Sequence, residues 1–125
     1  MLSAIRDSMT ISVTKDYSHA RERTHSARYY DISQPLVDKN YLDLRLGERS
    51  QITSARPLPP DVRLFASSLF AIPGVVDVKL YEHSVTVLIG PEAAWFRVEP
   101  RVIQAIRRHL GWQDNIEVTY HDQQS

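Results

Sequence analysis

The chain of 125 residues contains no cysteine. It therefore has no disulfide, no thiolate nucleophile and no thiolate ligand for a metal ion or an iron–sulfur cluster. We expect no cofactor to be bound through cysteine chemistry.

Other catalytic patterns are also missing. The four glycines are scattered singly, so no glycine-rich phosphate loop is present. None of the five histidines stands four residues from another, and there is no His-Glu-x-x-His sequence. Carboxylates such as Asp77 and Glu117 fall on predicted solvent-facing strand positions. We predict no catalytic residue, no metal ligand and no cofactor site, and hence a protein that is not an enzyme.

The chain also has no excess of positive or negative charge. Fifteen Lys and Arg residues balance fifteen Asp and Glu residues, so the formal net charge is zero. No overall field attracts the chain to nucleic acid or to an anionic membrane. No apolar run reaches the length of roughly 18–20 residues that a membrane span needs, and the first residues do not form a signal-peptide pattern. A cytoplasmic location is the expectation.

Apolar periodicity is strong between residues 60 and 110, where two helices are predicted. The first starts at Pro60 and ends at Pro73-Gly74. Its apolar stripe consists of Val62, Phe65, Leu69 and Ile72. The second begins near Pro100 after a separate helical turn over residues 92–96, and it stops at Gly111. We expect Trp95 and Phe96 to cover the core.

Alternating residues predict the strands. In the segment 41–46, Leu42, Leu44 and Leu46 are expected on one face. The segments 76–80 and 85–89 form a hairpin whose inward residues are Val76, Val78, Leu80, Val85, Val87 and Ile89. A closing strand covers residues 116–120, and residues 9–14 can form a further short strand.

These elements predict an α+β fold: a two-layer sandwich in which two helices cover one face of a mostly antiparallel sheet, close to the split βαββαβ plan. The domain is expected to span residues 39–121 and the polar tail residues 122–125. Residues 1–38 are interpreted as a partly disordered N-terminal arm, because residues 17–28 contain almost no apolar side chains. An alternative is a basic arm that binds nucleic acid through Arg21, Arg23, Arg28, Tyr29 and Tyr30.

The second helix is partly basic. Its arginines either form a solvated face that complements the helix dipole or form a surface that binds anions. We assign a candidate partner surface to the second helix and to the hairpin turn, comprising Arg97, Arg101, Arg107, Arg108, Tyr81 and His83.

The stretch from Leu64 to Leu110 resembles the N-terminal domain of NifU-like (Nfu-type) iron–sulfur scaffold proteins. The shared features are Ala66, the run Leu69-Phe70-Ala71-Ile72-Pro73-Gly74-Val75, Val78, Val85-Thr86-Val87, Trp95, Pro100, Val102 and Ile106. That family binds its cluster through a Cys-x-x-Cys motif in a separate C-terminal domain, and this chain has no cysteine.

The resemblance implies a non-enzymatic adaptor or accessory domain that contacts another protein, linked to iron–sulfur cluster assembly or delivery but without cluster ligands of its own. The alternative function is a small α+β module that binds nucleic acid or a ligand through the basic arm and the second helix. Tight nucleic-acid binding is not expected, since acidic residues are interleaved with the basic ones.

Overall fold

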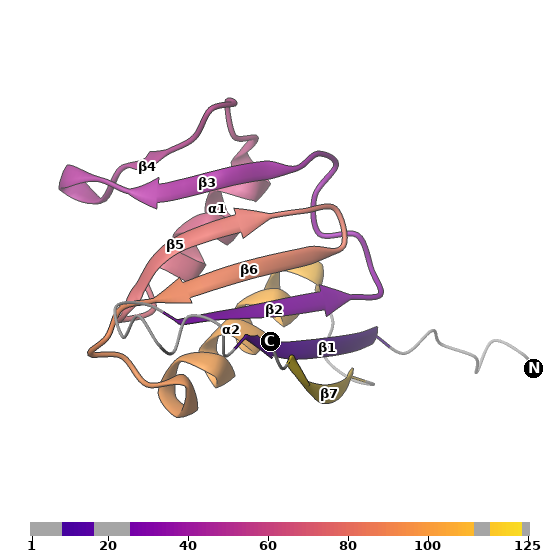
Figure 1. Cartoon of the computed structure of the whole chain (residues 1–125). Coiled ribbons are helices and arrows are strands. Elements are labelled where there is room, and N and C mark those ends of the chain that lie inside the picture. Colours follow the sequence, from indigo (N-terminus) through magenta and orange to yellow (C-terminus); the bar gives the residue numbers. More distant parts are fainter. Residues whose placement is uncertain (1–8, 17–25, 112–115, 124–125) are drawn as a thin grey trace, which may run out of the picture.

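The computed structural model of the chain describes residues 9–16, 26–111 and 116–123. It shows an α+β fold with one seven-stranded mixed sheet and two helices in these ranges (Figure 1). The strands are β1 (Met9–Asp16), β2 (Ser26–Ile32), β3 (Tyr41–Leu46), β4 (Ile52–Thr53), β5 (Val75–Leu80), β6 (Ser84–Ile89) and β7 (Ile116–Gln123). The helices are α1 (Pro60–Phe70) and α2 (Trp95–Leu110). Neither helix is long and apolar enough to cross a membrane.

The strand order in the sheet is β4-β3-β5-β6-β2-β1-β7. Neighbouring strands are antiparallel except β1 and β7, which run parallel at one edge. The sheet is larger than a βαββαβ layout. In addition, β3 pairs directly with β5 in the antiparallel sense, whereas a split βαβ unit has another strand between two parallel ones.

The extra strands come from the N-terminal region. The prediction that residues 1–38 form an arm outside the domain is wrong for the described part, because β1 and β2 lie inside the sheet and β2 pairs with both β1 and β6. The strand predicted over residues 9–14 is confirmed and extends to Asp16. The segment 17–25, which carries Arg21 and Arg23 of the predicted basic arm, lies outside the described residues.

The predicted alternation in β3 is interrupted by a bulge. The pairing register between β3 and β5 shifts between Tyr41 and Leu44, and Asp43 has a positive φ of 57°. As a result Tyr41 and Leu44 are buried, while 46% of Leu42 and 41% of Leu46 is exposed. The three leucines therefore do not share a buried face.

The hairpin of β5 and β6 is confirmed, with one change in register. Val85, Val87 and Ile89 are buried as predicted, and so are Val78 and Leu80. A second register shift lies between Val75 and Asp77 in β5. In consequence Val75 is buried and Val76 is exposed, which reverses the predicted order at the start of this strand.

Helix α1 matches the prediction closely. It starts at Pro60, where a proline has the φ angle of a first helical turn and its missing N–H leaves no bond unmade. Val62, Phe65 and Leu69 are buried, as is Ile72 just beyond the helix. The chain then turns into β5 through Gly74 with φ of +100°, a conformation that a residue with Cβ resists.

Helix α2 begins at Trp95, five residues earlier than predicted. The separate turn and the later helix are one continuous element, with Pro100 inside it. Only about one helical turn precedes Pro100, so the ring disturbs a short end of the helix instead of its middle. The helix ends at Gly111, as predicted, in the left-handed conformation with φ of 70°.

In Figure 1, α1 lies behind β3 and β5, and α2 runs behind β6 and β2. Buried residues from both helices and from β1, β2, β3, β5 and β6 form one hydrophobic cluster. Strand β7 adds the partly buried Ile116 and Val118 to this core.

Candidate functional site

The arginines of the predicted partner surface fall into two groups on α2. Arg97, Arg101 and Arg108 are exposed, and Arg107 is partly buried. The exposed three stand at positions i, i+4 and i+11, a spacing that places side chains on one face of a helix, with Gln104 between them at i+7. Arg107 lies outside this stripe.

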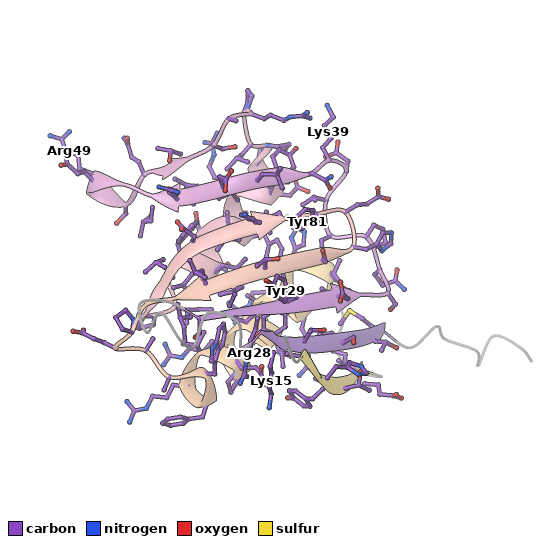
Figure 2. All side chains as sticks on the ribbon, viewed as in Figure 1. Lys15, Arg28, Tyr29, Lys39, Arg49 and Tyr81 are labelled. Carbon is purple, nitrogen blue, oxygen red and sulfur yellow. The ribbon has the colours of Figure 1, made fainter. Side chains whose placement is uncertain are left out.

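Tyr81 and His83 lie away from the first turn of α2, on the side of its C-terminal end. They lie in the turn between β5 and β6, whereas α2 starts beyond the opposite end of β6 (Figures 1 and 2). The backbone carbonyl of His83 accepts a hydrogen bond from the Ile32 N–H at 2.7 Å, so this turn is tied to the end of β2. The Leu36 N–H also donates to the Glu82 carbonyl over 2.6 Å, and the Leu36 carbonyl lies 2.7 Å from a His109 ring nitrogen. The turn therefore lies near the end of α2 that carries Arg107 and Arg108, whereas Arg97 and Arg101 lie toward the other end.

A groove runs between the C-terminal end of α1 and helix α2. One hollow, of about 580 Å³, is lined by Ile72, Pro73, Gly74, Glu92, Ala93, Ala94, Phe96, Arg97, Val98 and Arg101. A second, of about 500 Å³, is lined by Ser68, Ala71, Ile72, Arg101, Gln104, Ala105 and Arg108. Because they share Ile72 and Arg101, we treat them as one continuous surface, the α1–α2 groove.

The groove is positively charged. Among the described residues, Arg97, Arg101 and Arg108 line it together with a single carboxylate, that of Glu92. Within the described part of the chain, neither Arg101 nor Arg108 takes part in an ion pair. Like charges four residues apart on a helix repel each other. The charge of Arg101 and Arg108 is therefore not neutralised by an ion pair with any residue that the structure describes.

Phe96 is the most exposed large apolar side chain among the described residues, at 74%. It was expected to cover the core together with Trp95, and this expectation is wrong for Phe96. A helix that starts at Trp95 turns Trp95, Val98 and Glu99 toward the sheet and leaves Phe96 outside. The guanidinium of Arg97 lies 5.3 Å from the centre of the Phe96 ring.

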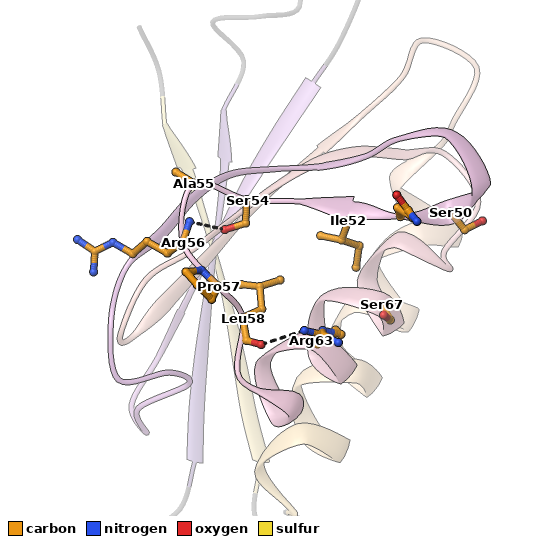
Figure 3. Close-up of a pocket in the computed structure, with 10 residues that line it drawn as sticks. Ser50, Ile52, Ser54, Ala55, Arg56, Pro57, Leu58, Arg63 and Ser67 are labelled. Carbon is orange, nitrogen blue, oxygen red and sulfur yellow. Dashed lines mark hydrogen bonds between the residues drawn. The ribbon is translucent and has the colours of Figure 1, made fainter.

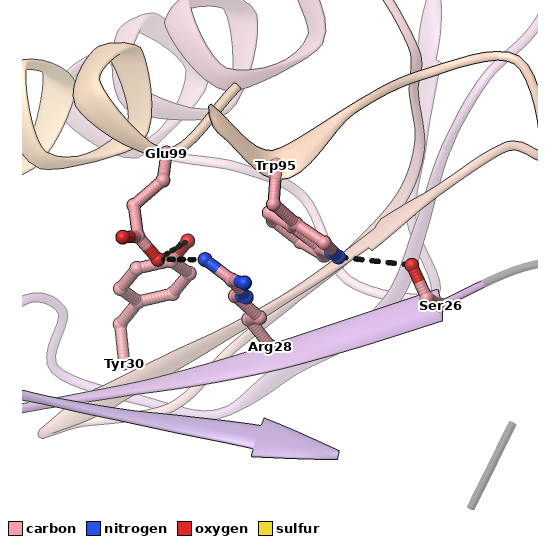
Figure 4. Close-up of polar contacts among 5 residues, drawn as sticks. All are labelled: Ser26, Arg28, Tyr30, Trp95 and Glu99. Carbon is pink, nitrogen blue, oxygen red and sulfur yellow. Dashed lines mark hydrogen bonds and ion pairs between the residues drawn. The ribbon is translucent and has the colours of Figure 1, made fainter. Parts of the chain in front are cut away.

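The inward side of α2 is anchored by a buried ion pair (Figure 4). Arg28 of β2 donates from Nη1 to Oε1 of Glu99 over 2.5 Å, and the hydroxyl of Tyr30 donates to the same oxygen over 3.4 Å. Glu99 is 9% exposed and is the only carboxylate in the helix. Since this carboxylate points inward to Arg28, it does not neutralise the outer arginines.

The first turn of α2 is fixed at a further point. Trp95 donates from Nε1 to Oγ of Ser26 over 2.9 Å, and the Arg28 guanidinium lies 4.8 Å from the centre of the Trp95 ring. Because these contacts hold the residue next to Phe96, the exposed ring and Arg97 project from a rigid helix end. This cluster was not predicted, because Arg28 and Tyr30 lie in a segment without apolar alternation.

The anchor also determines the titration of nearby tyrosines. Burial, and then the negative charge of Glu99, raise the pKa of Tyr30 far above its ordinary value. The same two causes raise the pKa of Tyr120 on β7. Both hydroxyls therefore remain protonated at neutral pH, and Tyr30 acts as a hydrogen-bond donor to the carboxylate.

Another hollow, of about 650 Å³, lies between the β4 region and α1 (Figure 3). Its lining combines polar residues with Ile52, Ala55, Pro57 and Leu58, and its cations among the described residues are Arg56 and Arg63. In Figure 3 the Arg56 guanidinium points away from the other lining residues, and Arg63 donates to the carbonyl of Leu58 at 3.4 Å. It therefore offers a ligand less unengaged charge than the α1–α2 groove does.

The described residues hold no group of three or more His, Asp or Glu side chains that could bind a metal ion. Two histidines have structural contacts: a ring nitrogen of His109 is 2.7 Å from the carbonyl oxygen of Leu36, and the ring stacks on Phe65 at 4.2 Å. Nδ1 of His83 is 3.3 Å from the carbonyl oxygen of Ile32.

Neither a family model nor a curated protein matches the chain.

Proposed function

We propose that the chain is a non-enzymatic protein-interaction domain, an adaptor or accessory module similar to the N-terminal domain of Nfu-type proteins. The proposal includes a link to iron–sulfur cluster assembly or delivery, without cluster ligands in this chain. Its main support is α2, which combines an exposed Phe96 with a stripe of arginines above the α1–α2 groove.

An exposed aromatic ring beside arginines is a composition typical of protein interfaces. Aromatic residues and arginine are enriched at the centre of such interfaces and supply much of their binding energy. Burial of the exposed Phe96 ring against a partner would be favourable, because it would remove apolar surface from water. The anchor at Glu99 and Trp95 pre-orders this surface, which lowers the entropic cost of binding.

The proposal also includes the arrangement of the helices and strands in layers. We infer two layers, with α1 and α2 packed on one face of the sheet and β1 and β2 inserted between β6 and β7. The Phe65–His109 stack between the two helices and the Glu99–Arg28 pair between α2 and β2 support this arrangement. Such a layout leaves the outer side of α2 open to a partner.

The alternative, an arm that binds nucleic acid, relies on three arginines, and one of them, Arg28, is already engaged inside the protein. The Arg28 side chain is only 15% exposed and is bound to Glu99. Tyr30 is fully buried and bound to the same carboxylate, so it cannot stack on a base. A protein partner is therefore the better-supported proposal.

Photo-crosslinking in the native host tests the function. A benzophenone amino acid replaces Phe96 in one variant and Leu42 in a control, since Leu42 is 46% exposed on β3, away from the groove. We expect a discrete protein adduct only at position 96. An excess of untagged wild-type protein should compete it away, and an excess of the Phe96→Ser variant should not.

Identification of the adduct by mass spectrometry tests the proposed link to iron–sulfur cluster assembly or delivery. An iron–sulfur assembly or acceptor protein supports the link to cluster biogenesis, and an unrelated protein removes that link. Equal labelling at both positions, or no adduct at position 96, would overturn the proposed interaction surface.

A further inference from the structure

We propose that the α1–α2 groove binds a short acidic segment of the partner protein, with one apolar side chain of that segment packed against Phe96. This inference rests on the proposed function and specifies the chemistry of the partner.

Charge complementarity is the first argument. The groove has three arginines and one glutamate in its lining, although the whole chain has no net charge. Arg101 and Arg108 have no ion pair among the described residues, and the only carboxylate of α2 is bound to Arg28. Carboxylates from a partner would supply the missing counter-charges as charge-assisted hydrogen bonds.

The spacing of the arginines limits the length of the segment. With a rise of about 1.5 Å per helical residue, Arg97 and Arg101 are about 6 Å apart along the axis of α2. By the same rise, Arg108 lies about 16 Å from Arg97. An extended peptide covers about 3.3 Å per residue, so five or six residues span the stripe. Two carboxylates two residues apart in that peptide match Arg97 and Arg101.

The apolar residues that line the groove favour a peptide over a nucleic acid as its ligand. Beside Arg97 and Arg101 the groove is lined by Ile72, Ala93 and Val98, and the exposed Phe96 ring stands at its margin. The aliphatic lining has no ring on which a base could stack, whereas a leucine or phenylalanine of an acidic segment would be desolvated against it. A protein segment therefore satisfies both parts of the surface.

The test uses the full chain labelled with ¹⁵N and blocked synthetic peptides of about ten residues. The probe peptide contains three aspartates, two of them two residues apart, and one leucine. One control peptide has asparagine in place of each aspartate, and another has serine in place of leucine. We expect amide shifts confined to residues that line the groove, and weaker binding by both controls.

Charge reversal supplies the matched variants. Arg101→Glu combined with Arg108→Glu should weaken the probe peptide at least about tenfold, since each lost charge-assisted bond is worth on the order of a tenfold change. Arg49→Glu combined with Arg56→Glu alters the net charge equally. Arg49 lies in the turn after β3, away from the groove (Figure 2), so this variant should bind normally.

Three results would overturn the inference: equal affinity for the aspartate and asparagine peptides, equal weakening by the two charge-reversed variants, or displacement of the probe peptide by a single-stranded RNA that binds more tightly. If any of these occurred while the adduct at position 96 formed, the proposed function would stand and the acidic partner would be wrong. If the adduct also failed to form, the proposed function would fail as well.

Discussion

The two halves of the sheet are stabilised in different ways. In the α1 half, which comprises β4, β3, β5 and β6, strands close in sequence pair with one another, and α1 contributes buried apolar residues such as Phe65 and Leu69. In the α2 half, which comprises β2, β1 and β7, segments from both ends of the chain meet. There α2 is held by the Arg28–Glu99 pair and the bond from Trp95 to Ser26.

The comparison shows where apolar pattern is sufficient to position a helix and where it is not. α1 presents an uninterrupted apolar stripe, so packing alone orients it. α2 also buries Val98, Val102 and Ile106, but it has a carboxylate on the same inner side, and a buried carboxylate is stable only with partners. The Arg28 guanidinium and the Tyr30 hydroxyl of β2 therefore act together with apolar packing to orient the helix that carries the candidate partner surface.

The largest expected effect is in the α1 half. Phe65→Ala should destabilise the protein by about 4 kcal/mol, because the side chain is 2% exposed and also stacks on His109. Urea unfolding followed by circular dichroism measures the change. The neighbouring Leu64→Ala is the control: Leu64 is 71% exposed, so its loss should cost less than about 0.5 kcal/mol. Equal effects of the two variants would mean that α1 packs with a different face.

The α2 half should respond to the loss of one charge. Glu99→Ala leaves the Arg28 guanidinium buried without its partner and removes the acceptor of Tyr30, so we expect a loss of about 3 kcal/mol in unfolding free energy. The double variant Arg28→Met with Glu99→Leu removes both charges and leaves only the Tyr30 hydroxyl without its acceptor, so it should be clearly more stable than Glu99→Ala. A double variant as unstable as the single one would show that the ion pair itself stabilises the fold.

This contrast also explains what could be predicted from the sequence. The α1 helix and the β5–β6 hairpin follow from apolar spacing, and both are confirmed. The bulge at Asp43 depends on one backbone angle that no local pattern encodes, so the exposure of Leu42 was missed. Strand β2 was missed because Arg28 and Tyr30 face the helices with polar tips that Glu99 binds.

The candidate site was predicted only in part. The arginine stripe is visible in the sequence as residues at i, i+4 and i+11 once a helix is assumed from Trp95 onward. The predicted surface included Arg97, Arg101 and Arg108, but Phe96 was assigned to the core and so was left out of it. The groove itself could not be predicted, since it depends on how the end of α1 packs against α2.

The two halves can also be compared at Gly74 and Gly111, the glycines that follow α1 and α2. Gly74→Ala, in the α1 half, should cost about 2–3 kcal/mol, because φ is +100° and an added Cβ would overlap the Cβ of Ala93. Gly111→Ala, after α2, should cost only about 1 kcal/mol, because φ is +70° and the space around it is open. Thermal unfolding of both variants measures the difference. Similar losses would mean that the Gly74 turn can relax away from Ala93.

The smallest effect concerns Tyr30, whose pKa is raised by burial and by the charge of Glu99. An unfolded tyrosine ionises near pH 10, whereas Tyr30 in the fold stays protonated at that pH. Its contribution to stability is therefore complete below pH 10 and declines as the pH rises above it, by about 1.4 kcal/mol per pH unit. Tyr30→Phe should remove this decline. Below pH 10 it should cost about 0.5–1.5 kcal/mol through the lost hydrogen bond.

Urea unfolding of the wild type and Tyr30→Phe between pH 9 and pH 11 checks this expectation. Burial also raises the pKa of Tyr41 and of Tyr120, but these residues are present in both proteins, so the difference between the two pH profiles isolates Tyr30. We expect the profiles to converge above pH 10, because only the wild type loses the Tyr30 contribution. Parallel profiles would mean that Tyr30 ionises in the folded protein at its ordinary pKa. In that case water would reach its hydroxyl, and the buried cluster around Glu99 could not be what holds α2 rigidly on β2.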